Sequence, residues 1–234
     1  PARLAQLPRV KKTEIVALTP SQLAKLRAAA VNNTHGVVLL FAVATGMRPS
    51  EYLALRWNDV DIDACTATVV RSIHRAGPGK WQIEEPKTQS SRRTVKFPTG
   101  IAKALKIHRA SQAKARLTAG TAWQDHDLVF CTEIGTPIDP QNLRNRAFKP
   151  ILEAAGIPLS TRLYDLRHTM ATLLIDEGVD MRTLADRLGH SSVATTLGMY
   201  VHPSTEMQAK AASKIGDLLF TRRGSATRRR APQP

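Results

Sequence analysis

The hydrophobic pattern at the start of the chain predicts three helices. Residues 19–22, TPSQ, combine a capping threonine, a proline at the first helical position and a glutamine three residues after the cap. The segment HGVVLLFAVATG, residues 35–46, is apolar on nearly every face and ends at Gly46, which is typical of a buried helix. We expect PSEYLALRW, residues 49–57, to form a third, short helix that begins at Pro49.

The pattern then changes to short β-branched runs and alternation. TATVVRSIHR at 66–75, KWQIEE at 80–85 and RRTVKFP at 92–98 predict three antiparallel strands, with the first two joined through AGPG. A further apolar run, LVFC at 128–131, resembles a strand.

Helical periodicity returns after Pro98. We expect helices over roughly 99–117, 140–155, 166–177, 181–188, 193–200 and 205–219. The elements together predict an α+β fold, mostly helical with a small three-stranded antiparallel sheet. No internal repeat is visible.

Composition divides the chain into four parts. Residues 1–18 are expected to be a basic linker, 19–202 a folded domain, 203–220 a separate C-terminal helix and 221–234 a basic disordered tail. Because the sequence starts at proline rather than methionine, we expect it to be a fragment whose natural N-terminal portion is missing.

The charge balance predicts a polyanionic partner. The chain has 34 Lys and Arg against 19 Asp and Glu, a net charge of +15. Subtracting the ends, +3 for residues 1–16 and +5 for 221–234, leaves +7 in the body, so the ends alone do not explain the excess. Nucleic acid is the most plausible partner, and a basic surface kept for solubility is the alternative.

The cysteines and apolar runs bear on location. Cys65 and Cys131 lie in or beside apolar runs, so two buried, reduced thiols in an intracellular protein are expected. No CxxC pair or His/Cys spacing suggests zinc. The longest apolar run, Val37 to Ala44, is too short to span a bilayer, so we expect no membrane partner.

The motif TGMRPSE, residues 45–51, places Arg48 at a helix entrance between a glycine turn and a proline. An arginine there suits a phosphate, because unpaired backbone amides and the helix dipole favour an anion at the same place. Glu51 would orient Arg48. A surface arginine paired with Glu51 explains the segment equally well.

The motif PKTQSSRRTV, residues 86–95, joins two predicted strands. Its basic and small polar residues, Lys87, Thr88, Arg92 and Arg93 among them, suit contact with a DNA backbone or minor groove. A solvated polar hairpin is the alternative.

The motif YDLRHTMATLLIDEG, residues 164–178, predicts a buried amphipathic helix with Arg167 and His168 near its first turn. A buried arginine needs a partner, and a bound phosphate can be that partner. An internal salt bridge, for example with Asp165 or Asp176, explains the same pattern.

The motif ADRLGHSSVATTLGMY, residues 185–200, places His190 just past Gly189, which ends one helix, and Tyr200 at the end of the next. The two helices resemble a helix-turn-helix, in which Tyr200 would serve for packing. A tyrosine has a pKa of about 10 and is a weak nucleophile unless its neighbours stabilise the anion.

Together and in this order, the four motifs resemble the catalytic domain of the tyrosine recombinase (phage integrase) family. The matching text is ATGMRPSEYLALRWNDVD, PKTQSSRRTV, YDLRHT and LGHSSVATTLGMYVH. The resemblance covers about residues 19–219 and implies the integrase catalytic-core fold for the predicted domain at 19–202, which would be catalytic.

The resemblance implies roles for five residues. Arg48 and Arg167 would hold the non-bridging oxygens of one phosphate and stabilise the transition-state charge. Lys87 would be the general acid for the leaving 5′-oxygen, and His190 would bond a phosphate oxygen or assist proton transfer. Tyr200 would attack phosphorus and form a 3′-phosphotyrosyl intermediate. No ATP, metal or other cofactor is implied.

One position departs from the family pattern. Tyr164 stands three residues before Arg167, where the family usually has histidine. A tyrosine donates a hydrogen bond to phosphate but is a poor base near neutral pH, which leaves the proton-transfer role open. His168 is expected to be a structural partner rather than a catalyst.

The resemblance also implies that the missing N-terminal portion is a DNA-binding region, to which residues 1–18 would be the linker, and it implies partners. They are a double-stranded DNA recombination site in the cytoplasm, other protomers in a tetramer on paired sites, and accessory DNA-bending proteins. The helix at 203–220 has an apolar face that is expected to dock on a neighbouring protomer, with folding back on its own domain as the alternative. Its members are Met207, Ala211, Ile215, Leu218 and Leu219.

The expected function is therefore site-specific DNA recombination, the integration or excision of a mobile element. A helix-turn-helix regulator that does not cut DNA is one alternative, although it would not need Arg48 with Lys87. A type IB topoisomerase is another, disfavoured by the LGHSS motif. A metal nuclease is disfavoured because no carboxylate cluster accompanies the arginines.

Overall fold

The structure is a computed structural model that describes residues 17–77, 80–84 and 92–200, and in the C-terminal part residues 209, 212–213, 215–216 and 219–220. The chain divides into two units, Pro1–Tyr200 and Val201–Pro234, which are considered separately. Within these described ranges, no helix is both long and apolar enough to cross a membrane.

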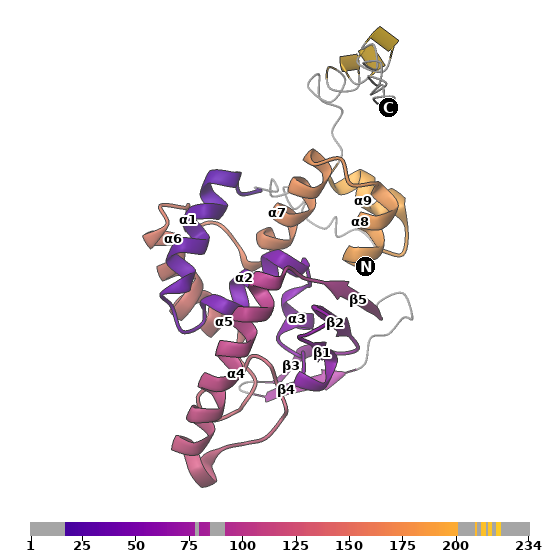
Figure 1. Cartoon of the computed structure of the whole chain (residues 1–234). Coiled ribbons are helices and arrows are strands. Elements are labelled where there is room, and N and C mark those ends of the chain that lie inside the picture. Colours follow the sequence, from indigo (N-terminus) through magenta and orange to yellow (C-terminus); the bar gives the residue numbers. More distant parts are fainter. Residues whose placement is uncertain are drawn as a thin grey trace, which may run out of the picture. The chain divides into compact units, whose positions relative to one another are not determined.

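The first two predicted helices are confirmed (Figure 1). Helix α1, Pro20–Val31, begins with a reciprocal cap, in which the Thr19 side chain accepts from the Gln22 N–H and the Gln22 side chain accepts from the Thr19 N–H. Helix α2, Gly36–Thr45, is followed by Gly46 in the left-handed region at φ 65°. Glycine adopts this conformation without strain, so the helix stops where the sequence predicts.

The third helix is shorter than predicted. Helix α3 spans Pro49–Tyr52 instead of 49–57, and a 3₁₀ turn, η2, follows at Trp57–Asp59. The intervening backbone pairs with a distant segment, because the Leu55 carbonyl accepts from the Val129 N–H at 2.8 Å. That segment, 128–131, was predicted to be a strand. It forms only the isolated bridges Arg56↔Leu128 and Cys131↔Pro137.

The predicted strand 66–75 is two strands in different sheets. Strand β2, Thr66–Val69, lies between β1, Val60–Asp61, and β5, Arg93–Lys96, in a three-stranded antiparallel sheet. Strand β3, Ser72–Gly77, pairs only with β4, Lys80–Glu84. The small three-stranded sheet therefore exists, but its members differ from those predicted.

Arg71 accounts for the break. Strand alternation would place Arg71 on the same face as the buried residues Val69 and Ile73. The Arg71 side chain is instead only half-buried, and its guanidinium pairs with Asp59. A charged side chain at a core position thus divides the predicted strand.

The later helices follow the prediction closely. They are α4 Thr99–Ala119, α5 Pro140–Leu143, α6 Lys149–Ala154, α7 Leu163–Asp176, α8 Met181–Leu188 and α9 Val193–Tyr200, with a 3₁₀ turn η4 at Gly120–Ala122. Between α5 and α6 lies a π-helical turn, η5, at Arg144–Phe148. Pro150 cannot donate within a regular helix, so a wider turn just before it is expected. The helix predicted at 205–219 falls largely outside the described residues, and the described positions in that range are helical.

The core consists of two clusters joined by α7. The larger contains Phe41, which contacts Phe97 and Phe130, and it extends to Leu166 on α7. The smaller contains Met170 of the same helix and the facing residues of α8. In Figure 1, α7 lies between α2 on one side and α8 and α9 on the other. Arg167 is therefore placed where the two clusters meet.

The cysteines differ from the expectation. Cys65 and Cys131 are free thiols, as predicted, but both are half-buried rather than buried. Cys65 ends a turn before β2 at φ 54°, which keeps its side chain near the surface.

Candidate active site

The centre of the site is the buried guanidinium of Arg167, whose side chain is 1% exposed. Its Nη1 donates to the Gly46 carbonyl and its Nη2 to the Leu188 carbonyl, each at 2.7 Å. These carbonyls lie at the C-terminal ends of α2 and α8, where the helix dipole favours a cation. Two helix ends therefore hold Arg167 without neutralising its charge.

The alternative of an internal salt bridge does not fit this geometry. Asp165 caps α7 by accepting from the Arg162 backbone N–H at 2.8 Å, and it pairs with the Arg162 guanidinium at 2.7 Å. No hydrogen bond or ion pair joins Arg167 to a carboxylate in the described part of the chain, and its Nε is buried there without a partner. Burial and then the charge of Arg48 lower the pKa of Arg167 to about 10, so it remains a cation at neutral pH.

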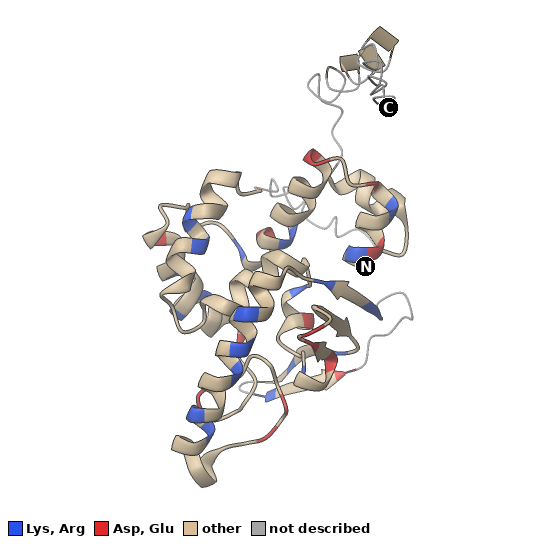
Figure 2. Cartoon of the chain, in the orientation of Figure 1, with Lys and Arg blue, Asp and Glu red and all other residues tan. Residues whose placement is uncertain are grey.

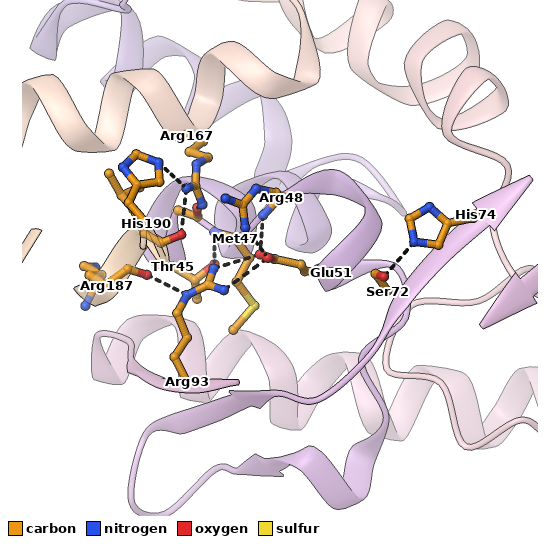
Figure 3. A network of polar contacts seen from close by, with 12 residues as sticks. Thr45, Met47, Arg48, Glu51, Ser72, His74, Arg93, Arg167, Arg187 and His190 are labelled. Carbon is orange, nitrogen blue, oxygen red and sulfur yellow. Dashed lines mark hydrogen bonds and ion pairs between the residues drawn. The ribbon is translucent and has the colours of Figure 1, made fainter. Parts of the chain in front are cut away.

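The Glu51 carboxylate binds the Arg48 side chain (Figure 3). Arg48 precedes α3, and its backbone N–H and Nη1 both donate to the Glu51 carboxylate, at 2.7 and 2.8 Å. Burial lowers the pKa of Arg48, but the charges of Glu51 and Tyr164 outweigh burial and raise it overall. Glu51 is buried, whereas 32% of the Arg48 side chain is exposed, so the guanidinium is held in place and still accessible.

Arg93 does not suit the predicted role of a direct DNA contact. Its side chain is only 7% exposed, and its Nη1 and Nη2 donate to Glu51 at 3.1 and 2.8 Å. Its Nε donates to the Arg187 carbonyl. Burial raises the pKa of Glu51, but Arg93 and Arg48 outweigh that effect and lower it. Arg93 is thus an internal partner that fixes the carboxylate beneath Arg48.

Arg187 is a residue of the site that sequence reasoning missed. Its Nη2 donates to the Ala44 carbonyl at 2.6 Å and to the Lys96 carbonyl at 2.9 Å, which ties α8 to α2 and β5. Burial and the charge of Arg93 lower its pKa. The only local signal is a basic residue in the last turn of a helix, which is common on solvated surfaces.

His190 is a neutral acceptor in this arrangement. Its Nε2 lies 3.0 Å from Arg167 Nη2 and its Nδ1 lies 2.8 Å from Thr196 Oγ1. Because a guanidinium only donates, Nε2 accepts and Nδ1 carries the proton. Burial, followed by the charges of Arg167 and Arg48, lowers the pKa of His190 to about 4.

Tyr200 lies against α7. Its hydroxyl is 2.8 Å from His168 Nδ1, and the two rings are tilted with centroids 5.4 Å apart. The Tyr164 ring also meets the His168 ring edge-on, with centroids 4.9 Å apart. Burial raises the pKa of Tyr200 to about 12, while the charges of Arg167 and Arg48 favour its anion. The structure thus brings the predicted nucleophile close to the arginines and into contact with His168.

The hairpin residues divide between the described and undescribed parts of the chain. Lys87 and Thr88 lie outside the described residues, so their predicted roles stay predictions. Arg92 is exposed just before β5. Its predicted DNA contact also stays a prediction.

The assembled site can hold an anion. Among the described residues that meet here, Arg48, Arg93, Arg167 and Arg187 contribute four positive charges and Glu51 one negative charge. The backbone carbonyls that accept from Arg93, Arg167 and Arg187 carry no charge, so among these described side chains the guanidinium groups outnumber the one carboxylate. A phosphate beside Arg48 and Arg167 would balance part of this excess.

The phage integrase family model matches residues 16–207, most of the chain and all of the elements that form this site. The chain belongs to the phage integrase family.

Curated relatives agree. The chain is 33% identical over 220 residues to a "tyrosine recombinase XerC-like" protein of Caldanaerobacter subterraneus, covering 89% of this chain and 56% of the relative. It is 32% identical to the ICEBs1 integrase of Bacillus subtilis over 178 residues, 76% of this chain and 47% of that protein. The chain spans about half the length of the curated relatives it matches.

Solved structures share the fold. A Tn1549 transposon integrase in complex with transposon right end DNA superposes with a TM-score of 0.74 at 21% identity, covering 88% of this chain and 68% of that chain. The XerA recombinase superposes with a TM-score of 0.65 at 25% identity, covering 88% and 66%. These matches confirm the predicted integrase catalytic-core fold.

Proposed function

We propose that the protein recombines DNA at specific sites, cutting and rejoining strands through a covalent 3′-phosphotyrosyl intermediate on Tyr200. One observation carries the proposal most: the Tyr200 hydroxyl lies beside a guanidinium, that of Arg167, which has no carboxylate partner in the described part of the chain. A nucleophile and an unbalanced cation at one place suit attack on a phosphodiester.

The two arginines would act on the phosphate. Arg48 is held by Glu51 and Arg167 by two helix ends, so both are fixed before DNA arrives. Charge builds on the non-bridging oxygens as Tyr200 attacks, and fixed donors stabilise that charge without reorganising. Lys87 would protonate the leaving 5′-oxygen, and Thr88 and Arg92 would contact the DNA nearby. The 5′-hydroxyl of another strand can then reseal the link without ATP.

The partner would be a double-stranded recombination site. The net charge of +15 favours a polyanion, and Figure 2 shows basic positions along α4. That helix has five basic residues and no acidic one: Lys103, Lys106, Arg109, Lys114 and Arg116. The structure of the Tn1549 transposon integrase contains transposon right end DNA. One of the similar proteins is the ICEBs1 integrase. We infer that this protein acts on the ends of a mobile element.

Covalent capture tests this proposal. Duplexes with a single 5′-bridging phosphorothiolate and randomised flanks are incubated with the protein, and adducts that survive denaturation are sequenced. The leaving 5′-thiol does not reseal the strand, so adducts accumulate. We expect an adduct with the unaltered chain and none with Tyr200→Phe, which should still bind DNA. The matched control Tyr164→Phe should still form the adduct. A Tyr200→Phe protein that forms it would refute the proposed nucleophile.

We further propose that several copies assemble on paired sites and that residues 203–220 dock on a neighbouring protomer. The described apolar residues Ile215, Leu219 and Phe220 are 56, 68 and 84% exposed, and apolar side chains at helical spacing favour a surface to cover. Truncation after His202 should leave binding to one site unchanged but prevent pairing of two sites in gel-shift experiments. Normal pairing by the truncated chain would contradict the docking.

A further inference from the structure

His168 occupies a position that the sequence did not assign to chemistry. It follows Arg167 on α7, and its side chain is 5% exposed. Its Nδ1 lies 2.8 Å from the Tyr200 hydroxyl, although 32 residues separate the two in sequence. The His168 ring contacts two tyrosine rings, with centroid distances of 4.9 Å to Tyr164 and 5.4 Å to Tyr200. One imidazole nitrogen is thus fixed on the oxygen that would attack phosphorus.

The protonation states favour a phenol that donates to this nitrogen. Burial raises the pKa of Tyr200 to about 12, so the hydroxyl keeps its proton at neutral pH. Burial also lowers the pKa of His168, so its ring is neutral and has one nitrogen free to accept. The titratable and charged groups that face His168 come from α7 and its cap, from α9 and from the turn before α9: Asp165, Arg162, Arg167, Tyr164, Tyr200 and His190.

Neighbouring groups are worse placed to take the proton. Tyr164 meets His168 through its ring, and among the described residues no hydrogen bond joins it to the Tyr200 hydroxyl. His190 Nε2 already accepts from Arg167, and its Nδ1 faces Thr196. Of the imidazoles described around the site, His168 is the one whose nitrogen contacts the Tyr200 oxygen.

We propose that His168 Nδ1 is the general base that takes the phenolic proton of Tyr200 as the phenolic oxygen attacks phosphorus. The Tyr–O–P bond forms and the P–O5′ bond breaks, while the leaving 5′-oxygen takes a different proton from the general acid. On resealing, the P–O5′ bond forms as the P–O–Tyr bond breaks. The incoming 5′-hydroxyl returns its proton to the group that served as general acid, and the phenolate recovers its proton from His168. This inference rests on the proposed function, with Tyr200 as the nucleophile.

The role explains how the chain functions without a histidine at Tyr164. A base one helical turn further along α7 contacts the same nucleophile. The Tyr164 ring then has a different task, which is to hold the imidazole edge-on and so restrict its rotation. Proton acceptance and ring positioning are divided between two neighbours on one helix face.

The test separates proton transfer from positioning. His168→Asn keeps a polar atom near the Nδ1 position but takes no proton, whereas His168→Ala removes both. The rate of single-turnover cleavage is measured as a function of pH on a phosphorothiolate duplex with the sequence identified by covalent capture. Its thiol leaving group needs no general acid. The pH dependence therefore reports the deprotonation of Tyr200. The control is His126→Asn, an exposed loop residue, which should leave rate and profile unchanged.

We expect His168→Asn to bind the duplex normally and to cleave it about 10²–10⁴-fold more slowly. Its rate should rise by about tenfold per pH unit above neutrality, because hydroxide must then form the phenolate, while the unaltered chain stays flat there. Added imidazole should restore part of the activity of His168→Ala. If His168→Asn cleaved slowly but with an unaltered pH profile, His168 would only position Tyr200, and the proposal would be overturned. A cleavage rate of His168→Asn near that of the unaltered chain would also overturn it.

A second measurement needs no His168 variant. Nitrogen NMR of the unaltered chain should show the His168 proton on Nε2, with Nδ1 accepting, and this signal should shift in Tyr200→Phe. A proton on Nδ1 would overturn the proposal. These outcomes differ from a failure of the proposed function. If the proposed function were wrong, the unaltered chain would form no covalent adduct, or the Tyr200→Phe variant would form one.

Discussion

Glu51 binds Arg93 across 42 residues of sequence through two hydrogen bonds of 3.1 and 2.8 Å. The same carboxylate holds Arg48, which faces solvent, so one buried acid links β5 to the entrance of α3. Its position depends on both arginines, and the direction of the Arg48 guanidinium depends on Glu51. The first prediction tests this coupling.

Glu51→Gln should destabilise the fold and slow cleavage together. Glutamine has the same shape but no charge, so it leaves buried cations without a counter-ion, a change that typically costs about 3–5 kcal/mol. The free energy of unfolding in urea measures it. Asp63→Asn is the control, because the Asp63–Lys106 pair is exposed at 89 and 62%, and we expect no resolvable change there. Equal urea midpoints for the two variants would contradict the coupling.

Arg167→Lys should be nearly as inactive as Arg167→Ala. Lysine keeps the charge, but its point-like ammonium does not reproduce the fork that spans the Gly46 and Leu188 carbonyls. Loss of one such donor typically lowers the rate by about 10²–10³-fold. Single-turnover cleavage of the phosphorothiolate duplex measures the effect.

The matched control is Arg162→Lys, at the exposed cap of the same helix. It should keep its pairing with Asp165 and cleave within a few-fold of the unaltered chain. If Arg167→Lys cleaved equally well, charge alone would explain the site and the helix-end carbonyls would be incidental.

The features predicted correctly from sequence are local ones. The cap at Thr19 and the glycine turn at Gly46 depend on residues that are close in sequence, so these helix ends were predictable. The position of Arg167 on a buried face followed from the periodicity of α7. Such signals depend on a few consecutive residues and on backbone preferences that hold in any fold.

The partners of these residues were not predictable in the same way. Arg167 is bound by carbonyls 121 and 21 residues away, which only the packing of α2 and α8 brings together. Any residue type offers a backbone carbonyl, so the sequence carries no sign of which one is used. The Tyr200 contact with His168 likewise depends on how α9 meets α7. Sequence therefore identified the chemical groups more readily than their bonds.

Stability should fall on mild acidification because of the site histidines. An unfolded histidine titrates near 6.5, whereas burial lowers the pKa of His190 to about 4 and also lowers that of His168. Between these values the unfolded state binds more protons, so the free energy of unfolding decreases as pH falls from 6.5. Glu51 acts in the same direction only below 4.5, its unfolded value. The interval from 6.5 to 4.5 therefore reports the buried histidines, which include His108 outside the site because burial lowers its pKa as well.

Urea unfolding across that interval measures the effect, and His190→Asn should make the decline shallower. His126→Asn, in an exposed loop, should leave it unchanged. A decline of the same slope in both variants would assign the acid sensitivity to groups outside the site.

Gly46→Ala should reduce activity by more than its effect on stability explains. Gly46 and Gly156 have nearly the same left-handed backbone, at φ 65° and 63°, so alanine should cost each about 1–2 kcal/mol of strain. They differ in surroundings, because a Cβ at Gly46 meets the end of the Met170 side chain whereas nothing lies within 4 Å at Gly156. Met170 can move, but the Gly46 carbonyl that holds Arg167 would shift with the turn. We therefore expect similar losses in urea midpoint and a loss of cleavage only in Gly46→Ala. Equal cleavage by the two alanine variants would show that Arg167 is positioned without the α2 carbonyl.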